Sequence, residues 1–386
     1  MPDFMNVLIL GGDGYLGWPT AMRFASNGHQ VTVVDNYLKR TLAKQNKSQA
    51  LIPTPDLLER ARIFQSLTNH QIDVIIEDCT NPTALNEIVQ RCRPEVLIHY
   101  AEQPSGPYSM RGFEEAQVTF NNNIHTTFNV IWSVIKHAPD CHIIKLGTMG
   151  EYGTPNIDIE EGWIDIHHRG RTDKFLYPRQ GATLYHTTKI MDTDLLWFYV
   201  RTYGLKVTDL MQGPVYGLIT EESLLDDRLL TNFHYDDLFG TVLNRFIVQA
   251  VAGIPLTLYG SGGQTRGFLN IKDTLQCLEL AAAQPVERGD LRILNQFTEQ
   301  FSVRQLAEQV RTAARSSGYQ TEIQTIKNPR KEMDSHYFNA AHQGLLDMGL
   351  KPHLLTTEII SEMISVIAKY QDRIDHSKVM PRFSYS

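Results

Sequence analysis

The stretch Val7-Leu8-Ile9-Leu10-Gly11-Gly12-Asp13-Gly14-Tyr15-Leu16-Gly17 joins an apolar run to a glycine-rich turn near the start of the chain. Gly11, Gly14 and Gly17 have G-x-x-G-x-x-G spacing, and a helix is expected directly afterwards, over residues 18–26. Strand, glycine turn and helix in this order are typical of a dinucleotide site. The glycines allow a tight turn and close approach to a pyrophosphate, and the helix N-terminus offers free N–H groups and a positive dipole end. We predict cofactor contacts along the whole turn: Gly11, Gly12, Asp13, Gly14, Tyr15, Leu16 and Gly17. The alternative interpretation is a glycine-rich turn of an unrelated α/β protein.

Asp35 ends the next expected strand, over residues 30–34. A carboxylate at this position can accept hydrogen bonds from the adenosine ribose hydroxyls, and it would repel a 2′-phosphate. The cofactor predicted from this pattern is therefore NAD rather than NADP. Lys39 and Arg40 lie nearby in the sequence and weaken that preference.

Short apolar runs alternate with longer amphipathic stretches through the first half of the chain. Strands are expected at 6–10, 30–34, 72–77, 95–100, 141–146 and 206–211, and helices at 18–26, 82–90 (with Asn81 as N-cap), 115–136 and 184–203. This alternation predicts an α/β fold of the Rossmann type, a doubly wound parallel sheet covered by helices on both faces.

Beyond about residue 213 the pattern loosens, with further helices expected at 243–252, 302–314 and 357–370. We predict an NAD-binding Rossmann domain over 1–212 that regains elements near 241–253 and 268–297. Residues 213–386 would mainly form a smaller α/β C-terminal domain that binds the substrate.

Composition excludes several classes of function. The chain has 386 residues, a net charge of −7 and a pI of about 6.1, so a nucleic-acid partner is not expected. Its four cysteines, at 79, 92, 141 and 277, lack the spacing of a metal site, and no metal is expected. No apolar run approaches the roughly 18 residues that span a bilayer. We expect no membrane insertion, and the cytoplasm as the compartment.

Two further segments predict acid–base chemistry. Tyr185 and Lys189 are four residues apart on an expected helix, so their side chains share a face. An ammonium beside a phenol lowers the pKa of the tyrosine, which can then exchange a proton with a substrate hydroxyl while hydride moves to or from a nicotinamide. Lys189 can also hold the nicotinamide ribose. Thr148, in Lys145-Leu146-Gly147-Thr148-Met149-Gly150-Glu151-Tyr152-Gly153, lies just beyond the fifth expected strand and supplies a second hydroxyl. The alternatives are a solvated helix face and a simple turn.

The order Thr148, Tyr185, Lys189 after a dinucleotide turn resembles the extended short-chain dehydrogenases. Longer blocks are similar to the UDP-sulfoquinovose synthase family within them, and they run through nearly the whole chain: "GGDGYLGW" (11–18), "VVDNYLKR" (33–40), "EQPSGPYSM" (102–110), "KLGTMGEYGTPNIDIEEG" (145–162), "YHTTK" (185–189), "YDDLFGTVLNRF" (235–246), "YGSGGQTRGFL" (259–269), "NQFTEQFSV" (295–303) and "NPRKE" (328–332).

The resemblance implies a reaction. NAD would oxidise C4 of UDP-glucose, water would leave across C5 and C6, sulfite would add to C6, and C4 would be reduced again, giving UDP-sulfoquinovose for sulfolipid biosynthesis. Thr148, Tyr185 and Lys189 would manage the C4 step. Met149 and Glu151 would lie near C5 and C6, and His186 would modulate the phenol.

The resemblance also implies binding positions. Those for the cofactor are Asp35, Asn36, Lys39, Asp78, Cys79, Asn122, Tyr185, Lys189, Gln212 and Val215. Those for the UDP-sugar are Gln103, Thr148, Gln212, Asn244, Arg245, Thr257, Tyr259, Gln264, Arg266 and Arg330. A diphosphate needs guanidinium donors, although a single arginine taken alone is more often a surface ion pair.

Pro104 is the departure that matters most, because the family has an arginine there, beside the substrate. Leu16 for Cys, Thr187-Thr188 for Leu-Ser and Met211 for Asn are further departures. They bear on the sulfite step more than on the NAD step. A nucleotide-sugar or nucleoside epimerase/dehydratase without sulfite addition is therefore the second hypothesis, and a non-catalytic NAD-binding regulator is the third. Fold analogy predicts a homodimer through a four-helix bundle of helices 115–136 and 184–203.

Overall fold

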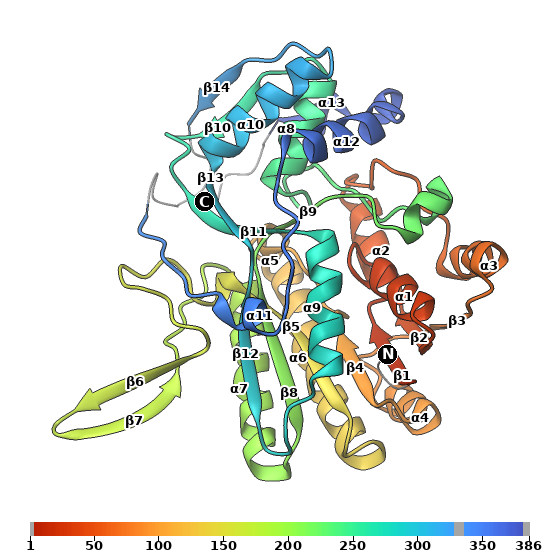
Figure 1. Cartoon of the computed structure of the whole chain (residues 1–386), viewed down its shortest axis with the longest axis vertical. Coiled ribbons are helices and arrows are strands. Elements are labelled where there is room, and N and C mark those ends of the chain that lie inside the picture. Colours follow the sequence, from red (N-terminus) through yellow and green to blue (C-terminus); the bar gives the residue numbers. More distant parts are fainter. Residues whose placement is uncertain (1–3, 328–335, 381–386) are drawn as a thin grey trace.

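A parallel sheet forms the centre of the molecule (Figure 1). The structure is a computed structural model that describes residues 4–327 and 336–380. Within these residues the central sheet has seven strands in the order β12-β8-β5-β4-β1-β2-β3, and every adjacent pair is parallel. Its strands are β1 (Asn6–Leu10), β2 (Gln30–Asp35), β3 (Ile72–Ile76), β4 (Val96–His99), β5 (His142–Thr148), β8 (Lys206–Gln212) and β12 (Leu291–Gln296). The chain reverses its direction of winding between β1 and β4, so the predicted Rossmann-type doubly wound sheet is confirmed.

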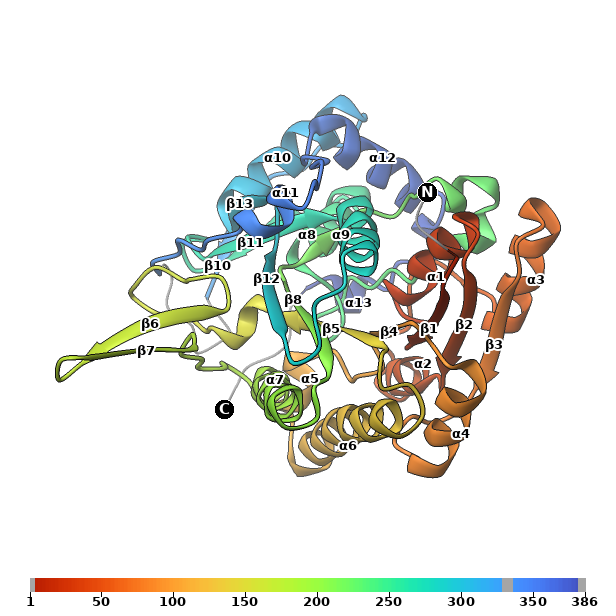
Figure 2. The ribbon, with the colours of Figure 1, turned by 60° about the horizontal axis from the view of Figure 1, so that its bottom comes forward.

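Helices cover both faces of this sheet (Figure 2). Those around it are α1 (Gly17–Ser26), α2 (Leu38–Gln45), α3 (Leu57–Thr68), α4 (Pro82–Cys92), α5 (Gly106–Ser109), α6 (Phe113–His137), α7 (Leu184–Tyr203) and α9 (Ile271–Ala283). Val7 and Ile9 of β1 belong to the core that α1 and α9 complete. Leu8 and Leu10, which point the other way, belong to the core beneath α4, α6 and α7. A strand buried on both faces is apolar at every position, which explains the unbroken run before Gly11.

A second, smaller core lies beyond β8. Its elements are β9 (Val215–Tyr216), α8 (Val242–Val251), β10 (Leu256–Tyr259), β11 (Thr265–Asn270), β13 (Glu299–Ser302), α10 (Val303–Ser316), β14 (Ile323–Ile326), α12 (Thr357–Ala368) and α13 (His376–Val379). Helix α11 (Gln343–Asp347) packs instead beside β12, and its buried Leu345 belongs to the core that α1 and α9 complete. Buried side chains of α8, α10 and α12 form one cluster there. The chain crosses back at β12, which pairs with β8 in the central sheet. Figure 1 shows this smaller part above the carboxyl ends of the sheet strands, where a site between the two parts would lie.

Local signals account for most element bounds. Asn81 caps α4, because its side chain accepts hydrogen bonds from the N–H groups of Thr83 and Ala84, as predicted. Strand β5 extends to Thr148, two residues beyond the predicted end at Leu146. Helices α2 and α3 were not predicted. Helix α2 follows Tyr37, which has a positive φ of 56° and no capping side chain, so no start signal precedes it.

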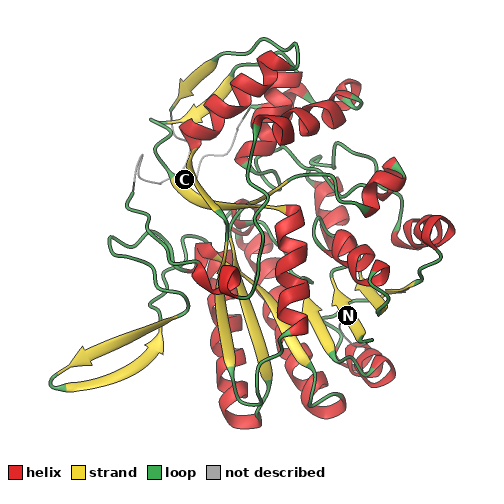
Figure 3. Ribbon diagram, in the orientation of Figure 1, coloured by secondary structure: helices red, strands yellow, loops and turns green. Residues whose placement is uncertain are grey.

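An antiparallel hairpin, β6 (Trp163–His168) and β7 (Arg171–Leu176), was also not predicted. It projects away from the rest of the molecule in Figure 3. Trp163 at its base packs edge-to-face on Trp197 of α7, with ring centroids 5.0 Å apart. In the described part of the chain, none of the helices has the length and apolar character needed to cross a membrane.

Candidate functional site

A cavity of about 1380 Å³ lies at the carboxyl ends of β1, β2, β4, β5 and β8. The glycine turn, the strand ends and α5 form one side, and residues of α8, β10 and β11 form the other. This is where ligands bind in open α/β sheets, because the change of winding direction separates the loops that follow neighbouring strands. The cavity therefore brings together the two halves of the predicted site.

The glycine turn has the geometry that a pyrophosphate requires. Gly11 has a φ of +89°, and a Cβ there would lie 2.8 Å from the backbone carbon of Tyr100. A Cβ on Gly17 would lie 2.0 Å from the carbonyl oxygen of Gly11. No side chain caps the N-terminus of α1. The N–H of Trp18 donates to the carbonyl oxygen of Gly14 at 3.4 Å, and Pro19 has no N–H, so the first turn offers an anion the N–H of Gly17, which lines the cavity. These observations fit a dinucleotide cofactor.

Asp35 ends β2 beside the turn and lines the cavity. Its carboxylate accepts hydrogen bonds from the backbone N–H of Asp13 at 2.9 Å and of Tyr37 at 2.7 Å. Burial, and next the charge of Asp13, raise the pKa of Asp35 to about 6. The carboxylate is therefore mostly ionised at neutral pH and has acceptor capacity left for ribose hydroxyls.

The side chain of Asp13 serves the protein itself. Its carboxylate forms ion pairs with Arg40, at 2.6 Å to Nε, and with the fully buried Arg60. Arg40 also donates to the carbonyl oxygen of Pro55 at 2.7 Å. The position of Arg40 in the sequence suggested that it could bind the 2′-phosphate of NADP. Its guanidinium is instead paired with these acceptors within the protein, so it does not favour NADP.

Most other residues predicted for the cofactor also line the cavity. These are Gly14, Tyr15, Leu16, Asn36, Lys39, Asp78, Cys79, Asn122, Gln212 and Val215. Gly12 does not line the cavity. A Cβ there would meet the side chain of Val33, so this glycine allows the turn to pack closely on β2. Lys39 lies 5.9 Å from the ring centroid of Phe239, and burial lowers its pKa.

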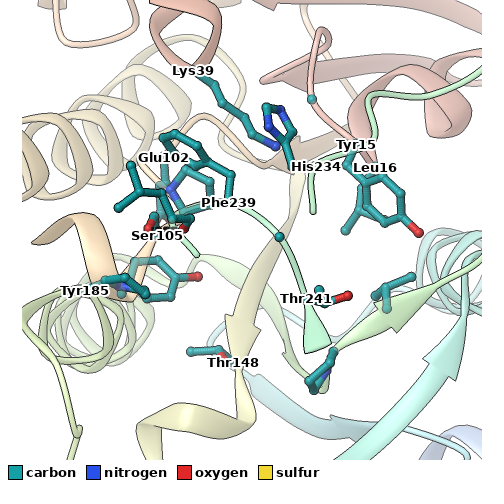
Figure 4. A pocket seen from close by; sticks show the side chains of 18 of the residues that line it. Tyr15, Leu16, Lys39, Glu102, Ser105, Thr148, Tyr185, His234, Phe239 and Thr241 are labelled. Atoms are coloured by element: carbon teal, nitrogen blue, oxygen red, sulfur yellow. Dashed lines mark hydrogen bonds between the residues drawn. The ribbon is translucent and has the colours of Figure 1, made fainter. Parts of the chain in front are cut away.

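Thr148 and Tyr185 direct their hydroxyl groups into the same space (Figure 4). Both line the cavity. Thr148 is the last residue of β5, and its Oγ1 accepts a hydrogen bond from the N–H of Gly150 at 3.1 Å. The hydroxyl proton of Thr148 is therefore available for another acceptor.

The pKa of Tyr185 is raised in this ligand-free structure, whereas the sequence prediction was that it is lowered. Burial, and next the charge of Glu102, raise the pKa of the Tyr185 phenol above its ordinary value. The Lys189 ammonium is buried behind the cavity wall and donates to Glu102 Oε1 at 2.6 Å. Burial lowers the pKa of Lys189, but the charges of Glu102, Asp192 and Glu151 together outweigh that effect, so the pKa is raised. Sequence reasoning missed Glu102, whose acidic side chain directly after an apolar strand was the available signal.

His186 also lines the cavity and packs against Gly150, where a Cβ would lie 2.4 Å from its Nε2. Its Nδ1 lies 3.2 Å from the hydroxyl of Thr183. Burial and the nearby charge of Arg266 lower the pKa of His186 to about 4, so the imidazole is neutral at pH 7.

Met149 and Glu151 both follow Thr148, but their side chains lie in different places. Met149 lines the cavity. Glu151 is fully buried outside the cavity lining, and its Oε1 lies 3.2 Å from Nζ of the buried Lys145. Lys145 also lies 3.2 Å from Asp209 of β8. The structure therefore places Glu151 in a buried ion network behind β5 rather than beside a substrate. The sequence held a signal for this network, because Lys145 and Asp209 each place a charged residue inside a largely apolar strand.

Polar groups on the far side of the cavity fit a nucleotide. Asn244, Arg245, Tyr259, Gln264 and Arg266 line it. Gln264 is buried, and neither its amide oxygen nor its amide nitrogen has a hydrogen-bond partner among the described residues. The Oδ1 of the buried Asn244 also lacks one in the described part of the chain. Buried polar atoms are normally paired, so these atoms indicate a missing ligand.

Two of the described residues predicted for the UDP-sugar do not line the cavity. Thr257 is fully buried, and its carbonyl oxygen accepts from Arg245 at 2.9 Å, so it positions the arginine. Gln103 is buried and donates to Thr119 Oγ1 at 2.7 Å, which fixes the loop after β4. Arg330 lies outside the described residues. Pro104, in contrast, lines the cavity.

A metal site is not apparent: the described ranges hold no group of three or more His, Cys, Asp or Glu side chains placed to bind one ion.

Comparisons with known proteins identify the family of the chain. The model of the NAD dependent epimerase/dehydratase family matches residues 7–295. The chain is 45% identical over 380 residues to the chloroplastic UDP-sulfoquinovose synthase of Spinacia oleracea, covering 98% of this chain and 79% of that protein. It is 41% identical over 381 residues to the UDP-sulfoquinovose synthase of Sulfolobus acidocaldarius, covering 98% and 97%.

A solved structure shares the fold. The UDP-glucose 4-epimerase of Thermotoga maritima, determined with UDP-glucose, superposes with a TM-score of 0.70 at 20% identity, over 94% of this chain and 98% of that one. Sequence and structure thus agree over nearly the full length. The chain belongs to the NAD dependent epimerase/dehydratase family and, within it, to the UDP-sulfoquinovose synthases.

Proposed function

We propose that this protein forms UDP-sulfoquinovose from UDP-glucose and sulfite through a 4-keto sugar, with NAD as its cofactor. The observation that carries the proposal is the convergence of the Thr148 and Tyr185 hydroxyls in a cavity that extends from the glycine turn to Arg245. One end of this cavity suits a dinucleotide and the other a uridine diphosphate. A sugar attached to that diphosphate would reach the two hydroxyls between them.

The residues would divide the work at C4. Thr148 would donate a hydrogen bond to the C4 oxygen, and Tyr185 would take the C4 hydroxyl proton and return it at the end of the cycle. NAD, when bound, supplies the acceptor for the C4 hydride and gives the hydride back. Asp35 would hold the adenosine ribose and Lys189 the nicotinamide ribose, while N–H groups of the glycine turn would hold the pyrophosphate.

The middle of the reaction balances without an external oxidant. A ketone at C4 acidifies the C5 proton, so C5–H and C6–O break and one water leaves. Sulfite then forms the C6–S bond, and C5 regains a proton. Met149 lines the cavity and would pack against this part of the sugar. His186, neutral at pH 7, would accept or donate a hydrogen bond there.

Mass spectrometry of reactions with UDP-glucose, run with and without sulfite, tests the proposal. We expect a sulfonated UDP-sugar only when sulfite is present. In D₂O without sulfite, deuterium should enter C5, because reversible loss of the C5 proton does not need the second substrate. Tyr185→Phe is the matched control and should abolish both signals. An epimer of UDP-glucose with no sulfonated product would overturn the proposal.

Pro104 favours a second candidate, an NAD-dependent epimerase or dehydratase of the same nucleotide sugar that adds no sulfite. Pro104 lines the cavity and brings neither a charge nor a hydrogen-bond donor to an incoming anion. Pro104→Arg discriminates between the two candidates. A sulfite-using enzyme should gain apparent affinity for sulfite from the added guanidinium, whereas an enzyme without a sulfite step should form no sulfonated product in either version.

We also propose a homodimer through α6 and α7. Five large side chains of these neighbouring helices are exposed to between 36% and 48%: Phe120, Phe128, Trp132, Phe198 and Tyr203. An apolar patch of this kind is typical of a protein interface. The molar mass measured by light scattering should be that of two chains, and Phe128→Asp should shift it toward one chain. A single-chain mass for the unaltered protein would contradict the proposal.

A further inference from the structure

Glu102 occupies an unusual position in the site. It lies three residues beyond the end of β4 and lines the cavity on the side of Ser105 and Tyr185 (Figure 4). Its side chain is only 4% exposed. Oε1 accepts from Lys189 at 2.6 Å and lies 3.5 Å from Nε2 of His99. Oε2 is buried and has no hydrogen-bond partner among the described residues. A buried carboxylate with a free oxygen is costly unless its charge is used.

The ion pair between Glu102 and Lys189 changes the electrostatic environment of the Tyr185 phenol. Tyr185 and Lys189 share one face of α7, and a free ammonium there would stabilise the phenolate. With a carboxylate 2.6 Å from the ammonium, the pair is neutral as a whole. The carboxylate itself disfavours a second negative charge on the neighbouring phenol.

We propose that Glu102 is a positioning residue, which fixes the Lys189 ammonium against the cavity wall and thereby keeps Tyr185 in its protonated form in the ligand-free protein. Tyr185 would then ionise only when cofactor and sugar bring compensating charge and hydrogen bonds. The proposal rests on the proposed function, in which Tyr185 exchanges the C4 proton.

The other charged groups around this pair do not duplicate the role of Glu102. Behind the pair lie Lys145, Glu151 and Asp192, of which none lines the cavity, and their charges act on Tyr185 in opposing directions. Asp209 neutralises Lys145 from β8 at 3.2 Å. Burial lowers the pKa of His99 to about 4, so His99 carries no charge at pH 7. Glu102 is therefore the carboxylate of this cluster that faces the ligand space.

Titration of Tyr185 in the protein without cofactor or substrate tests the proposal. The Glu102→Gln variant keeps the shape and one oxygen acceptor for Lys189 but removes the negative charge. Ring-labelled tyrosine, with the Tyr185 resonance assigned through Tyr185→Phe, reports ionisation by NMR. An ordinary tyrosine is half ionised near pH 10. We expect wild-type Tyr185 to show no ionisation there, and the Glu102→Gln resonance to titrate about one to three pH units lower than the wild type.

The sign follows from both effects of the substitution. Loss of the Glu102 charge removes repulsion from the phenolate, and release of Lys189 adds attraction, so each lowers the pKa of Tyr185. The acidic limb of the kcat profile should move to lower pH in the same variant. Identical titrations of Tyr185 in wild type and Glu102→Gln would overturn the proposal.

Two variants guard the interpretation. Glu299→Gln removes a carboxylate that accepts from the hydroxyl of Tyr216 at 2.7 Å, away from the cavity, and should leave the Tyr185 titration unchanged. Glu102→Asp retains the charge and should keep Tyr185 protonated near pH 10, which decides the matter if Glu102→Gln does not fold. Because the titration needs no substrate, it is independent of whether sulfite is used. An unchanged titration together with normal sulfonated product would reject this inference and leave the proposed function standing.

Discussion

A Cβ atom on Gly17 would lie 2.0 Å from the carbonyl oxygen of Gly11. Real Cβ contacts do not reach such a distance, so the first residue of α1 packs against the end of β1 only as glycine. This contact sets how closely helix and strand approach, and with it the direction in which the N-terminal N–H groups of α1 face the cavity.

Gly17→Ala should therefore open the turn. We expect a lower melting temperature and a loss of NAD affinity of about tenfold or more, since the phosphate-binding N–H groups move with the helix. Gly28→Ala is the matched control. Gly28 has a φ of +88° but nothing within 4 Å of its Cβ position, so it should cost only about 1–2 kcal/mol of stability and leave NAD affinity unchanged. Calorimetric NAD binding and thermal unfolding measure both effects. Wild-type NAD affinity in Gly17→Ala would contradict this account of the turn.

The affinity for NAD should depend on the ionisation of Asp35. Burial raises its pKa to about 6, so the carboxylate is charged above that pH and protonated below it. Ribose hydroxyls donate more strongly to the charged form, by about 1 kcal/mol, and affinity should fall about fivefold as pH drops from 8 to 5. Asp35→Asn should bind weakly, with little change over the same range. A wild-type affinity for NAD that rises as the pH falls would contradict the expected direction of this pH dependence.

The two cavity hydroxyls should have separable effects on turnover. Tyr185→Phe removes the proton-exchanging group and should lower kcat by about 10²–10⁴-fold, with NAD still bound. Thr148→Ser keeps the hydroxyl that accepts from the N–H of Gly150 and should retain most activity. Thr148→Val keeps the shape but loses this hydroxyl, and kcat should fall about 10²-fold. Steady-state assays of the C4 step measure all three. Equal activities of the Ser and Val variants would show that the Thr148 hydroxyl has no part in the reaction.

The sequence predicted the elements that local pattern controls. Val7 to Gly17 carries the spacing, apolar run and glycines of one strand–turn–helix unit, and parallel pairing then brings Asp35 and Thr148 to the same edge of the sheet. Side-chain partners across the fold were not predictable in this way. Lys189 meets Glu102 at 2.6 Å from 87 residues away. No local signal encodes that contact. The predicted pKa direction for Tyr185 was wrong because burial, and next the charge of Glu102, raise the pKa.

Gln264 offers a test in which stability and binding change in opposite directions. It is 5% exposed, and neither amide atom has a hydrogen-bond partner in the described residues, a cost of about 1–3 kcal/mol in the ligand-free chain. Gln264→Leu removes that cost at similar volume and should raise the melting temperature by a few degrees. The same change should raise the KM for the UDP-sugar about tenfold, because the ligand loses its partner. Gln249→Leu is the matched control: this buried glutamine donates to Thr257 Oγ1 at 2.8 Å and accepts from the N–H of Thr257, so its replacement should lower the melting temperature. Equal losses of stability in both leucine variants would show that the Gln264 amide is already paired in the ligand-free protein, and would contradict its assignment as a ligand-binding group.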